Sequence, residues 1–336
     1  MRVVENLNAA LHGAFAEHPG LTLLGEDVVD PYGGAFKATK GLSSRFPDRV
    51  LATPLSEGGI VGVGAGLALA GAPAMVEIMF ADFVTLAFDQ IVNFAAKSVS
   101  MYGSHVPMPL TVRCPTGGGR GYGPTHSQSP QKHFVGVPGL SLYELSPLHD
   151  SAGLLRRVLD AKEPAIVFED KVLYTQRMLD DGTGSGEVDD LFSFDRPAPD
   201  VARVYAEDPS TADCVVIAPG GVAHRAIAAA RSLLLEEEIT CQVLVPTRLH
   251  PFDVAPLLPA LRSAAAVVVA EESTAGGTWG AEVAHRLHRE LWGTLRGPVA
   301  LAHSADSIIP TAPHLEADVL LSTEDVHRTA LEAVRG

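Results

Sequence analysis

The alternation of short apolar segments with longer, helix-length segments is the feature that most constrains how this chain can fold. Alternation of this kind is typical of a mostly parallel β-sheet whose two faces are both covered by helices. In the first half of the chain we expect strands at residues 21–24, 50–52, 74–78, 110–113, 140–143 and 166–169, and helices at residues 3–15, 60–70, 83–100 and 151–161.

The pattern breaks near residue 180 and then restarts. Residues 180–200 are rich in Gly, Asp and Pro and show little periodicity, which favours a linker. A second set of strands is expected at residues 214–218, 241–245, 266–270 and 299–302, with helices at residues 222–235 and 279–291. The sequence therefore predicts two doubly wound α/β domains, residues 1–180 and 201–336, joined by a linker at residues 181–200.

Composition narrows the classes of function. Lys and Arg number 25 and Asp and Glu number 40, so the formal net charge is −15. Such an acidic surface repels phosphate backbones and argues against a nucleic-acid partner. No apolar run is long enough to span a membrane, and the N-terminal residues do not resemble a signal peptide. The three cysteines, Cys114, Cys214 and Cys241, are too widely spaced for a disulfide framework, and we expect a cytoplasmic protein.

Two glycine patterns invite a nucleotide-binding or phosphate-binding interpretation. Gly62, Gly64 and Gly66 resemble a dinucleotide loop, but their spacing is wrong and they lie inside a helix-like segment. Close packing of that helix explains these glycines better. The run GGGRG at residues 117–121 either holds a phosphate group or forms an ordinary loop, and the sequence does not decide between the two.

Hydrolase and metal-site interpretations find little support. No G-x-S-x-G sequence is present, and Ser127 beside His126 is a poor nucleophile–base pair because sequence neighbours rarely face each other. His285 and His288 share a helix face, but no further ligand is implied, so the sequence predicts no metal site.

Three segments place chemically useful side chains at the ends of expected strands. TPLSEGG contains Glu57, EIMFADF contains Met79 and Phe83, and GYGPTHSQS contains His126. Because strand ends at one edge of an α/β sheet line the ligand crevice, these side chains could bind a flat heterocycle. The alternative is an acid that caps its own helix, a core phenylalanine and a loop histidine.

These segments resemble the β subunit of the thiamine-diphosphate-dependent decarboxylase component of 2-oxo acid dehydrogenases, such as the pyruvate, branched-chain and acetoin enzymes. The matching stretches are GEDV with YGGAF (25–36), TPLSEGGIVG (53–62), EIMFADF with AFDQIVNFAAK (77–97), THSQSP (125–130), EPAIVFE (163–169), and EES with GGTWGAE (271–282). They extend over nearly the whole chain. The resemblance implies a transketolase-like pyrimidine-binding domain followed by a transketolase C-terminal-like domain.

The resemblance also implies roles for individual residues. Glu57 matches the glutamate that hydrogen-bonds N1′ of the cofactor's aminopyrimidine and thereby promotes loss of the thiazolium proton. Phe83 and Met79 match side chains that contact the pyrimidine, and His126 matches a histidine beside the substrate. Glu26 and Asp89, with Glu57, match acids that line a water-filled proton path between paired active sites. Ordinary interface residues are the alternative for Glu26 and Asp89.

An absence in the sequence implies a partner chain. The superfamily holds the cofactor's diphosphate and Mg²⁺ with a GDG motif and later asparagines, and this chain has no GDG. The resemblance therefore implies that an α subunit supplies this half of the site within an α₂β₂ heterotetramer. It also implies a lipoyl-bearing acyltransferase as a further partner. A structural K⁺ is doubtful because Ala161 stands where relatives that bind it carry an acid, with Asp160 one place earlier.

Two other functions remain open from the sequence. A transketolase-like subunit would transfer a two-carbon ketol unit from a sugar phosphate to an acceptor or a carrier protein. A non-catalytic scaffold would keep the fold without the chemistry, although Glu57, Phe83 and His126 are all present. The substrate itself is not specified by the sequence.

Overall fold

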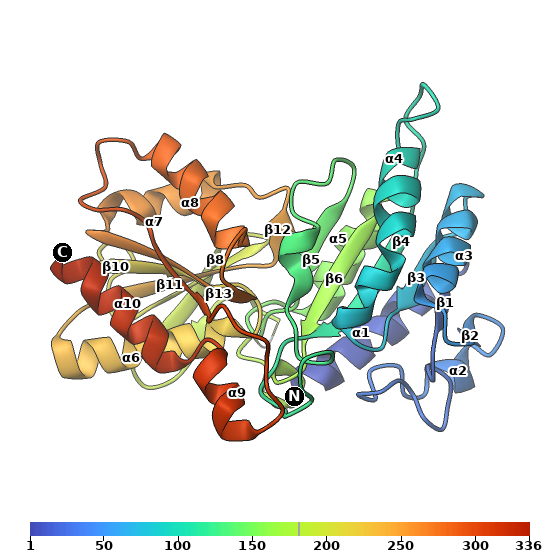
Figure 1. Cartoon of the computed structure of the whole chain (residues 1–336), viewed down its shortest axis with the longest axis horizontal. Helices are drawn as coiled ribbons and strands as arrows, with labels where there is room; N and C mark the ends of the chain where they lie inside the picture. The colour runs from blue at the N-terminus through green and yellow to red at the C-terminus, as the bar shows by residue number, and fades with distance from the viewer. Residues whose placement is uncertain (181) are drawn as a thin grey trace. The chain divides into compact units, whose positions relative to one another are not determined.

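The computed structural model describes residues 1–180 and 182–336, which divide into two units (Figure 1). Unit 1 comprises Met1–Thr116, Phe134–Leu145 and Asp150–Met178. Unit 2 comprises Gly117–His133, Ser146–His149 and Leu179–Gly336. The second unit therefore includes two segments from the first half of the chain.

Unit 1 is built on a parallel sheet. Its strands are β1 (Thr22–Gly25), β2 (Val50–Ala52), β3 (Ala74–Glu77), β4 (Leu110–Thr116), β5 (Ser141–Glu144) and β6 (Ala165–Asp170). They lie in the order β5-β6-β4-β3-β1-β2, and each neighbouring pair is parallel. The chain leaves β1 toward β2 on one side and returns to β3 on the other. This reversal creates a topological switch point at the carboxyl ends of β1 and β3.

Helices cover both faces of this sheet (Figure 1). On one face, α1 (Val3–Glu17) and α5 (Ser151–Ala161) bury apolar residues in a common core with alternate residues of the strands. On the other face lies α3 (Glu57–Leu69), where Gly64 approaches the side chains of Val76 and Leu110. A short helix, α2 (Leu42–Arg45), precedes β2, and a 3₁₀ turn, η4 (Leu173–Thr175), follows β6.

The helix expected at residues 83–100 is present but is not uniform. It consists of a 3₁₀ segment, η1 (Ala81–Ala87), a π segment, η2 (Gln90–Ala95), and a short α segment, α4 (Ala96–Ser98). Apolar spacing indicates a helical face, but it does not distinguish these hydrogen-bonding patterns. Short π segments within helices are frequent at functional sites.

Unit 2 contains a mixed sheet. Its strands are β7 (Gly186–Glu187), β8 (Ser193–Ala198), β9 (Val201–Tyr205), β10 (Cys214–Ile217), β11 (Cys241–Pro246), β13 (Ala266–Thr274) and β14 (Ala300–Ser304), in the order β14-β13-β10-β11-β9-β8-β7. The first four strands in that order are parallel, and β9, β8 and β7 are antiparallel.

The helices of unit 2 enclose its parallel strands. A shared apolar core joins α6 (Val222–Glu237) and α10 (Thr323–Arg335) to one face of the sheet. On the other face, Gly280 of α8 (Trp279–Glu290) approaches Val269. The shorter elements of this unit are η3 (Pro130–His133), β12 (Arg248–His250), η5 (Ala255–Leu257), α7 (Leu258–Ser263) and α9 (Pro313–Val319).

Residues 181–200, which we expected to form a linker, instead contribute β7 and β8 to the second sheet. Phe192 and Phe194 are each only 2% exposed and belong to the core of unit 2. The many Asp, Gly and Pro residues around this apolar pair favoured a linker, so the sequence pattern did not predict a strand there. Asp181 of the expected linker lies outside the described residues.

The two-domain α/β fold predicted from the sequence is confirmed. Among the described residues, no helix is both long enough and apolar enough to cross a membrane.

Candidate active site

Three expected site residues of unit 1 follow neighbouring strands at the same edge of the sheet. Glu26 comes directly after β1, Glu57 follows β2, and Met79 follows β3. Phe83 lies slightly further along, in η1. Since these strands are parallel, all of these residues lie at the carboxyl edge, around the switch point where α/β sheets bind ligands.

Glu57 is the first residue of α3. Its carboxylate does not cap the helix, because Ser56 occupies the N-cap position and no side-chain capping bond is formed there. Within the described residues, no hydrogen bond to the half-buried Glu57 carboxylate is formed. The helix N-terminus favours a negative charge at this position. Glu57 is therefore available to bind a group from outside this chain.

Glu26 lies close enough to Glu57 for the two carboxylates to repel each other. Glu26 is 8% exposed, and its Oε1 atom has no hydrogen-bond partner in the part of the chain that is described. Burial, and then the charges of Glu57 and Asp27, raise the pKa of Glu26, while a hydrogen bond from the Ser56 backbone amide opposes the rise. A buried carboxyl group beside another acid favours a shared proton or an external hydrogen-bond donor.

Phe83 belongs to a series of aromatic rings. Its ring meets Phe80 edge-on with centroids 6.3 Å apart, and Phe80 meets Phe36 edge-on at 5.7 Å. Phe36 in turn contacts Tyr174 at 5.4 Å. Both Phe83 and Met79 are only half-buried, so each keeps a surface that an apolar ring could contact. This distinguishes Phe83 from an ordinary core phenylalanine.

Among the described residues, the hydrogen-bond partners of Asp89 are neighbours on its own helical segment. Asp89 is exposed at the start of η2, where its carboxylate accepts hydrogen bonds from Asn93 at 2.8 Å and Gln90 at 3.3 Å. Its proposed place on a proton path therefore remains a prediction from the family resemblance.

The glycines of α3 serve close packing. A Cβ atom on Gly64 would lie 2.7 Å from Cγ2 of Val76, and one on Gly62 would lie 3.3 Å from Oε1 of Gln90. This confirms the packing interpretation for Gly62 and Gly64 but not for Gly66, where a Cβ atom would meet no atom within 4 Å. All three glycines lie inside α3, which excludes a dinucleotide loop at this place.

His126 belongs to unit 2, and the structure relates its position only to residues of that unit. It lies in a segment that we call the glycine-rich loop, residues 117–126. The Nδ1 atom of His126 lies 3.0 Å from Oγ1 of Thr125, and its backbone amide donates to the Gly123 carbonyl at 3.3 Å. Whether His126 approaches Glu57 remains a prediction.

The backbone amides of the glycine-rich loop already have acceptors. Gly118 donates to Glu272 at 2.7 Å, and Gly119 and Gly121 donate to Glu316 at 3.1 and 2.9 Å. These bonds answer the question left open by the sequence. The amides hold carboxylates of their own chain, which argues against a phosphate-binding role for them.

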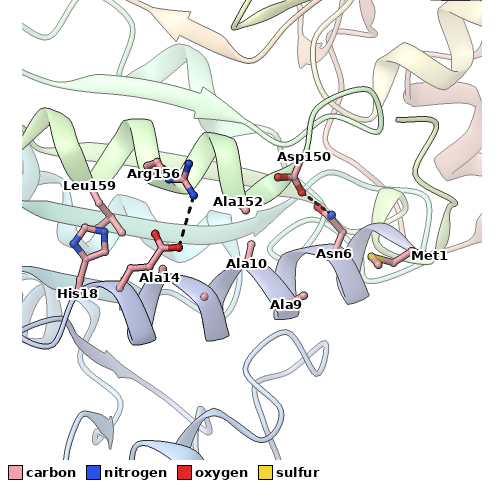
Figure 2. Close-up of a pocket in the computed structure, with 12 residues that line it drawn as sticks. Met1, Asn6, Ala9, Ala10, Ala14, His18, Asp150, Ala152, Arg156 and Leu159 are labelled. Atoms are coloured by element: carbon pink, nitrogen blue, oxygen red, sulfur yellow. Dashed lines mark hydrogen bonds and ion pairs between the residues drawn. The ribbon is translucent and has the colours of Figure 1, made fainter. Parts of the chain in front are cut away.

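A separate pocket of about 180 Å³ lies between α1 and α5, on the sheet face opposite α3 (Figure 2). Asn6 bonds Asp150 at one end, and the Glu17–Arg156 pair spans it. Small side chains, including Ala10 and Ala14, form much of its lining. None of the expected site residues lines this pocket. In the described residues, no group of three or more His, Cys, Asp or Glu side chains is arranged to hold a metal ion.

Comparisons with known proteins identify the families of both domains. Residues 1–176 match the family "Transketolase, pyrimidine binding domain", and residues 205–326 match "Transketolase, C-terminal domain". The chain is 34% identical over 312 residues to the pyruvate dehydrogenase E1 component subunit beta of Leifsonia xyli subsp. xyli, covering 92% of this chain and 88% of that protein. It is 31% identical over 313 residues to the 3-methyl-2-oxobutanoate dehydrogenase subunit beta of Mycobacterium tuberculosis, covering 93% and 86%.

The chain belongs to the 2-oxo acid dehydrogenase β subunits. The family, which depends on thiamine diphosphate and works with an α subunit, is the one that the sequence predicted. Among solved structures, a split-gene transketolase described as an inactive β₄ tetramer superposes with a TM-score of 0.73. That likeness covers 98% of this chain and 97% of the other, and at 19% identity it shows the fold alone.

Sequence reasoning missed one buried group of charges in this β subunit. Arg113 of β4 donates to Glu77 at 2.9 Å and to both oxygens of Glu169 at 2.7 and 2.9 Å, and Tyr174 donates to Glu169 at 2.5 Å. Burial and the Glu169 charge raise the pKa of Tyr174 well above its ordinary value. This group holds together β3, β4 and β6 near the ends that carry Met79. The sequence signal that could have revealed this group is Arg113 itself, a charged residue within an otherwise uncharged strand.

Proposed function

We propose that this β subunit forms the pyrimidine half of a thiamine diphosphate site, with Glu57 as the acid that exchanges a proton with the cofactor. The observation that supports the proposal is the position of Glu57 and Glu26 at the switch point of a parallel sheet, with the half-buried Phe83 following β3 at the same edge. A carboxyl group and an apolar ring surface are what an aminopyrimidine requires.

The residues present fit this group. Glu57 has no hydrogen-bond partner within the described chain, and its carboxyl group would hold a proton at the N1′ position of the pyrimidine. Phe83 would stack against the ring, and Met79 would also contact the pyrimidine. When bound, thiamine diphosphate supplies the carbon nucleophile that the decarboxylation of a 2-oxo acid requires.

Glu26 would assist Glu57 in holding that proton. The nearby charge of Glu57 disfavours ionisation of Glu26, so Glu26 tends to keep its proton. The raised pKa of Glu26 and its unpartnered oxygen support this arrangement. His126 would contact the carboxylate of the substrate and donate or accept a proton as the acyl group passes to a lipoyl carrier.

The proposed site requires an α subunit that holds Mg²⁺ and the diphosphate. Exposed apolar residues near Glu57 support a partner surface: Leu55 is 81% exposed, Val63 56% and Leu86 65%. Leu55 lies two residues before Glu57, and Val63 lies on α3, the helix that begins at Glu57. We therefore assign this surface to the α subunit within an α₂β₂ heterotetramer, in which the second domains pair the β chains.

A two-carbon ketol transfer remains the competing proposal. The transketolase likeness among solved structures concerns the fold, whereas the relatives above 30% identity are named as 2-oxo acid dehydrogenase subunits. Assay of the reconstituted αβ enzyme against a panel of 2-oxo acids and ketose phosphates tests the choice. We expect decarboxylation of a 2-oxo acid, and turnover of ketose phosphates alone would contradict it.

A further inference from the structure

The glycine-rich loop that carries His126 is fastened by a glutamate far away in the sequence. The two carboxylate oxygens of Glu316, in α9, each accept one backbone amide of the loop, from Gly119 and from Gly121. Glu316 is only 4% exposed. Hydrogen bonds to a buried, charged acceptor are among the stronger ones in proteins.

A second carboxylate holds the loop where it begins. Glu272 accepts the Gly118 amide at 2.7 Å and pairs with Arg225 at 2.5 Å. Glu272 is 8% exposed, and Arg225 on α6 fixes its orientation. Three backbone amides of the loop are therefore bonded to two different elements of unit 2.

The glycine-rich loop packs tightly against a neighbouring segment. A Cβ atom on Gly118 would lie 2.4 Å from Cδ1 of Leu320, and one on Gly123 would lie 2.5 Å from Oγ1 of Thr311. The loop backbone therefore lies directly against the segment that contains α9. A movement of α9 would move the loop with it.

His126 follows this fastened backbone closely. Its amide bonds Gly123, which touches Thr311, and its ring bonds Thr125. Only four residues separate Gly121, the last amide held by Glu316, from His126, and Gly121 and Gly123 adopt left-handed backbone φ angles of +68° and +77° that glycine reaches without strain.

We propose that Glu316 is a positioning residue for His126: it fixes the glycine-rich loop, and so the histidine ring, in the arrangement that the reaction needs. This rests on the proposed role of His126. Glu316 does not itself meet the substrate, and its effect on turnover should pass entirely through His126.

The first experiment measures the loop itself and does not depend on activity. Amide hydrogen exchange over the peptide spanning residues 117–127 is followed in the αβ enzyme carrying Glu316→Ala or Glu316→Gln. Asp318→Ala, an exposed residue of the same helix, is the matched control. We expect at least about tenfold faster exchange for the alanine variant, since two strong bonds are lost. The glutamine variant should be intermediate, because its side chain can accept only one of the two amides.

The second experiment tests whether the effect reaches the chemistry through His126. Glu316→Ala should lower kcat by about tenfold to a hundredfold, as expected when a reacting group is displaced by about 1 Å. Proton exchange at the thiazolium carbon of bound cofactor should stay unchanged. In a His126→Ala background, Glu316→Ala should have no further effect on kcat. In the otherwise wild-type enzyme, Glu316→Gln should lower kcat less than Glu316→Ala does.

The outcomes separate the two proposals. Additive losses from Glu316→Ala and His126→Ala, or exchange in the loop equal to that of Asp318→Ala, would overturn the positioning role. If wild-type enzyme turns over no 2-oxo acid, the proposed function fails, yet the hydrogen-exchange result still reports whether Glu316 fixes the loop. If Glu316→Ala does not fold, both experiments are carried out and judged with Glu316→Gln.

Discussion

Glu26 and Glu57 are neighbours in space with different surroundings. Glu26 is buried with an oxygen that has no partner among the described residues, whereas Glu57 is half-buried at the N-terminus of α3. Their closeness makes the protonation of one depend on the other. At the residue scale, we therefore expect separate consequences from replacing each carboxyl group.

Replacing Glu57 should remove proton exchange with the cofactor. Glu57→Gln is expected to lower kcat of the αβ enzyme by roughly 10²–10⁴, the range typical of losing an acid–base group. Folding should survive, since the side chain forms no hydrogen bond within the described chain. Hydrogen–deuterium exchange at the thiazolium carbon is the measurement, with Glu324→Gln, an exposed residue in the first turn of α10, as control. An unchanged exchange rate in Glu57→Gln would refute the assignment.

Replacing Glu26 should change how stability depends on pH. Its folded-state pKa is raised above 4.5, so its contribution to stability is fully present below that pH and is lost as pH rises through the raised pKa. Glu26→Gln removes this loss. The Tm of the variant relative to wild type should therefore increase from about pH 4 to about pH 8. Thermal unfolding of the isolated chain checks this, and a difference in Tm that does not change with pH would count against it.

At this scale the sequence allowed part of the site to be predicted. Glu57, Met79 and Phe83 follow recognisable strands, so the rule for parallel sheets placed them at one edge. The buried group around Arg113 was not predictable in the same way. Its partners Glu77 and Glu169 lie 36 and 56 residues away, and only the register of β3, β4 and β6 brings them together.

At the scale of elements, the position of α3 depends on its small residues. Gly64→Ala would place a Cβ atom 2.7 Å from Val76. Overpacking of this kind is expected to cost about 1–3 kcal/mol of unfolding free energy. A Cβ atom on Gly66, in the same helix, would meet no atom within 4 Å, so Gly66→Ala should stabilise the helix by about 0.5–1 kcal/mol. Denaturant unfolding of both variants tests this contrast. Changes of the same sign in the free energy of unfolding would contradict it.

The elements themselves were predicted where apolar spacing was clear. The parallel strands of both sheets and the helices α5, α6 and α8 lie close to their expected ranges. The antiparallel strands β7 and β8 were not expected, because Gly and Asp dominate around Phe192 and Phe194. The 3₁₀ and π geometry of residues 81–95 depends on hydrogen bonding, which side-chain spacing does not record.

At the scale of the whole molecule, the assignment of the glycine-rich loop to unit 2 was beyond the reach of sequence reasoning. The loop follows β4 in the chain, but its bonds to Glu316 join residues 195 and 197 positions apart. Order along the chain does not reveal these bonds to Glu316. This loop carries His126. The proposed substrate contact therefore depends on hydrogen bonds to Glu316 that no local sequence pattern predicts.

Assembly is the next prediction at this scale. The exposed apolar side chains of Leu55, Val63 and Leu86 need a partner, and obligate interfaces typically bury more than about 2,000 Å². We expect an α₂β₂ heterotetramer when the chain is co-expressed with its α subunit. Multi-angle light scattering measures the mass. Leu55→Asp should weaken assembly while the exposed Leu235→Asp, on α6, should not. A stable αβ pair would contradict the tetramer.

The central claim is that this chain supplies only half of a cofactor site. It offers Glu57 and Phe83 for the pyrimidine, but its own net charge of −15 opposes a diphosphate that lacks a metal and its ligands. Calorimetric titration with thiamine diphosphate and Mg²⁺, with and without the α subunit, tests this most directly. We predict tight, Mg²⁺-dependent binding only when both chains are present, and micromolar Mg²⁺-dependent binding by this chain alone would contradict the claim.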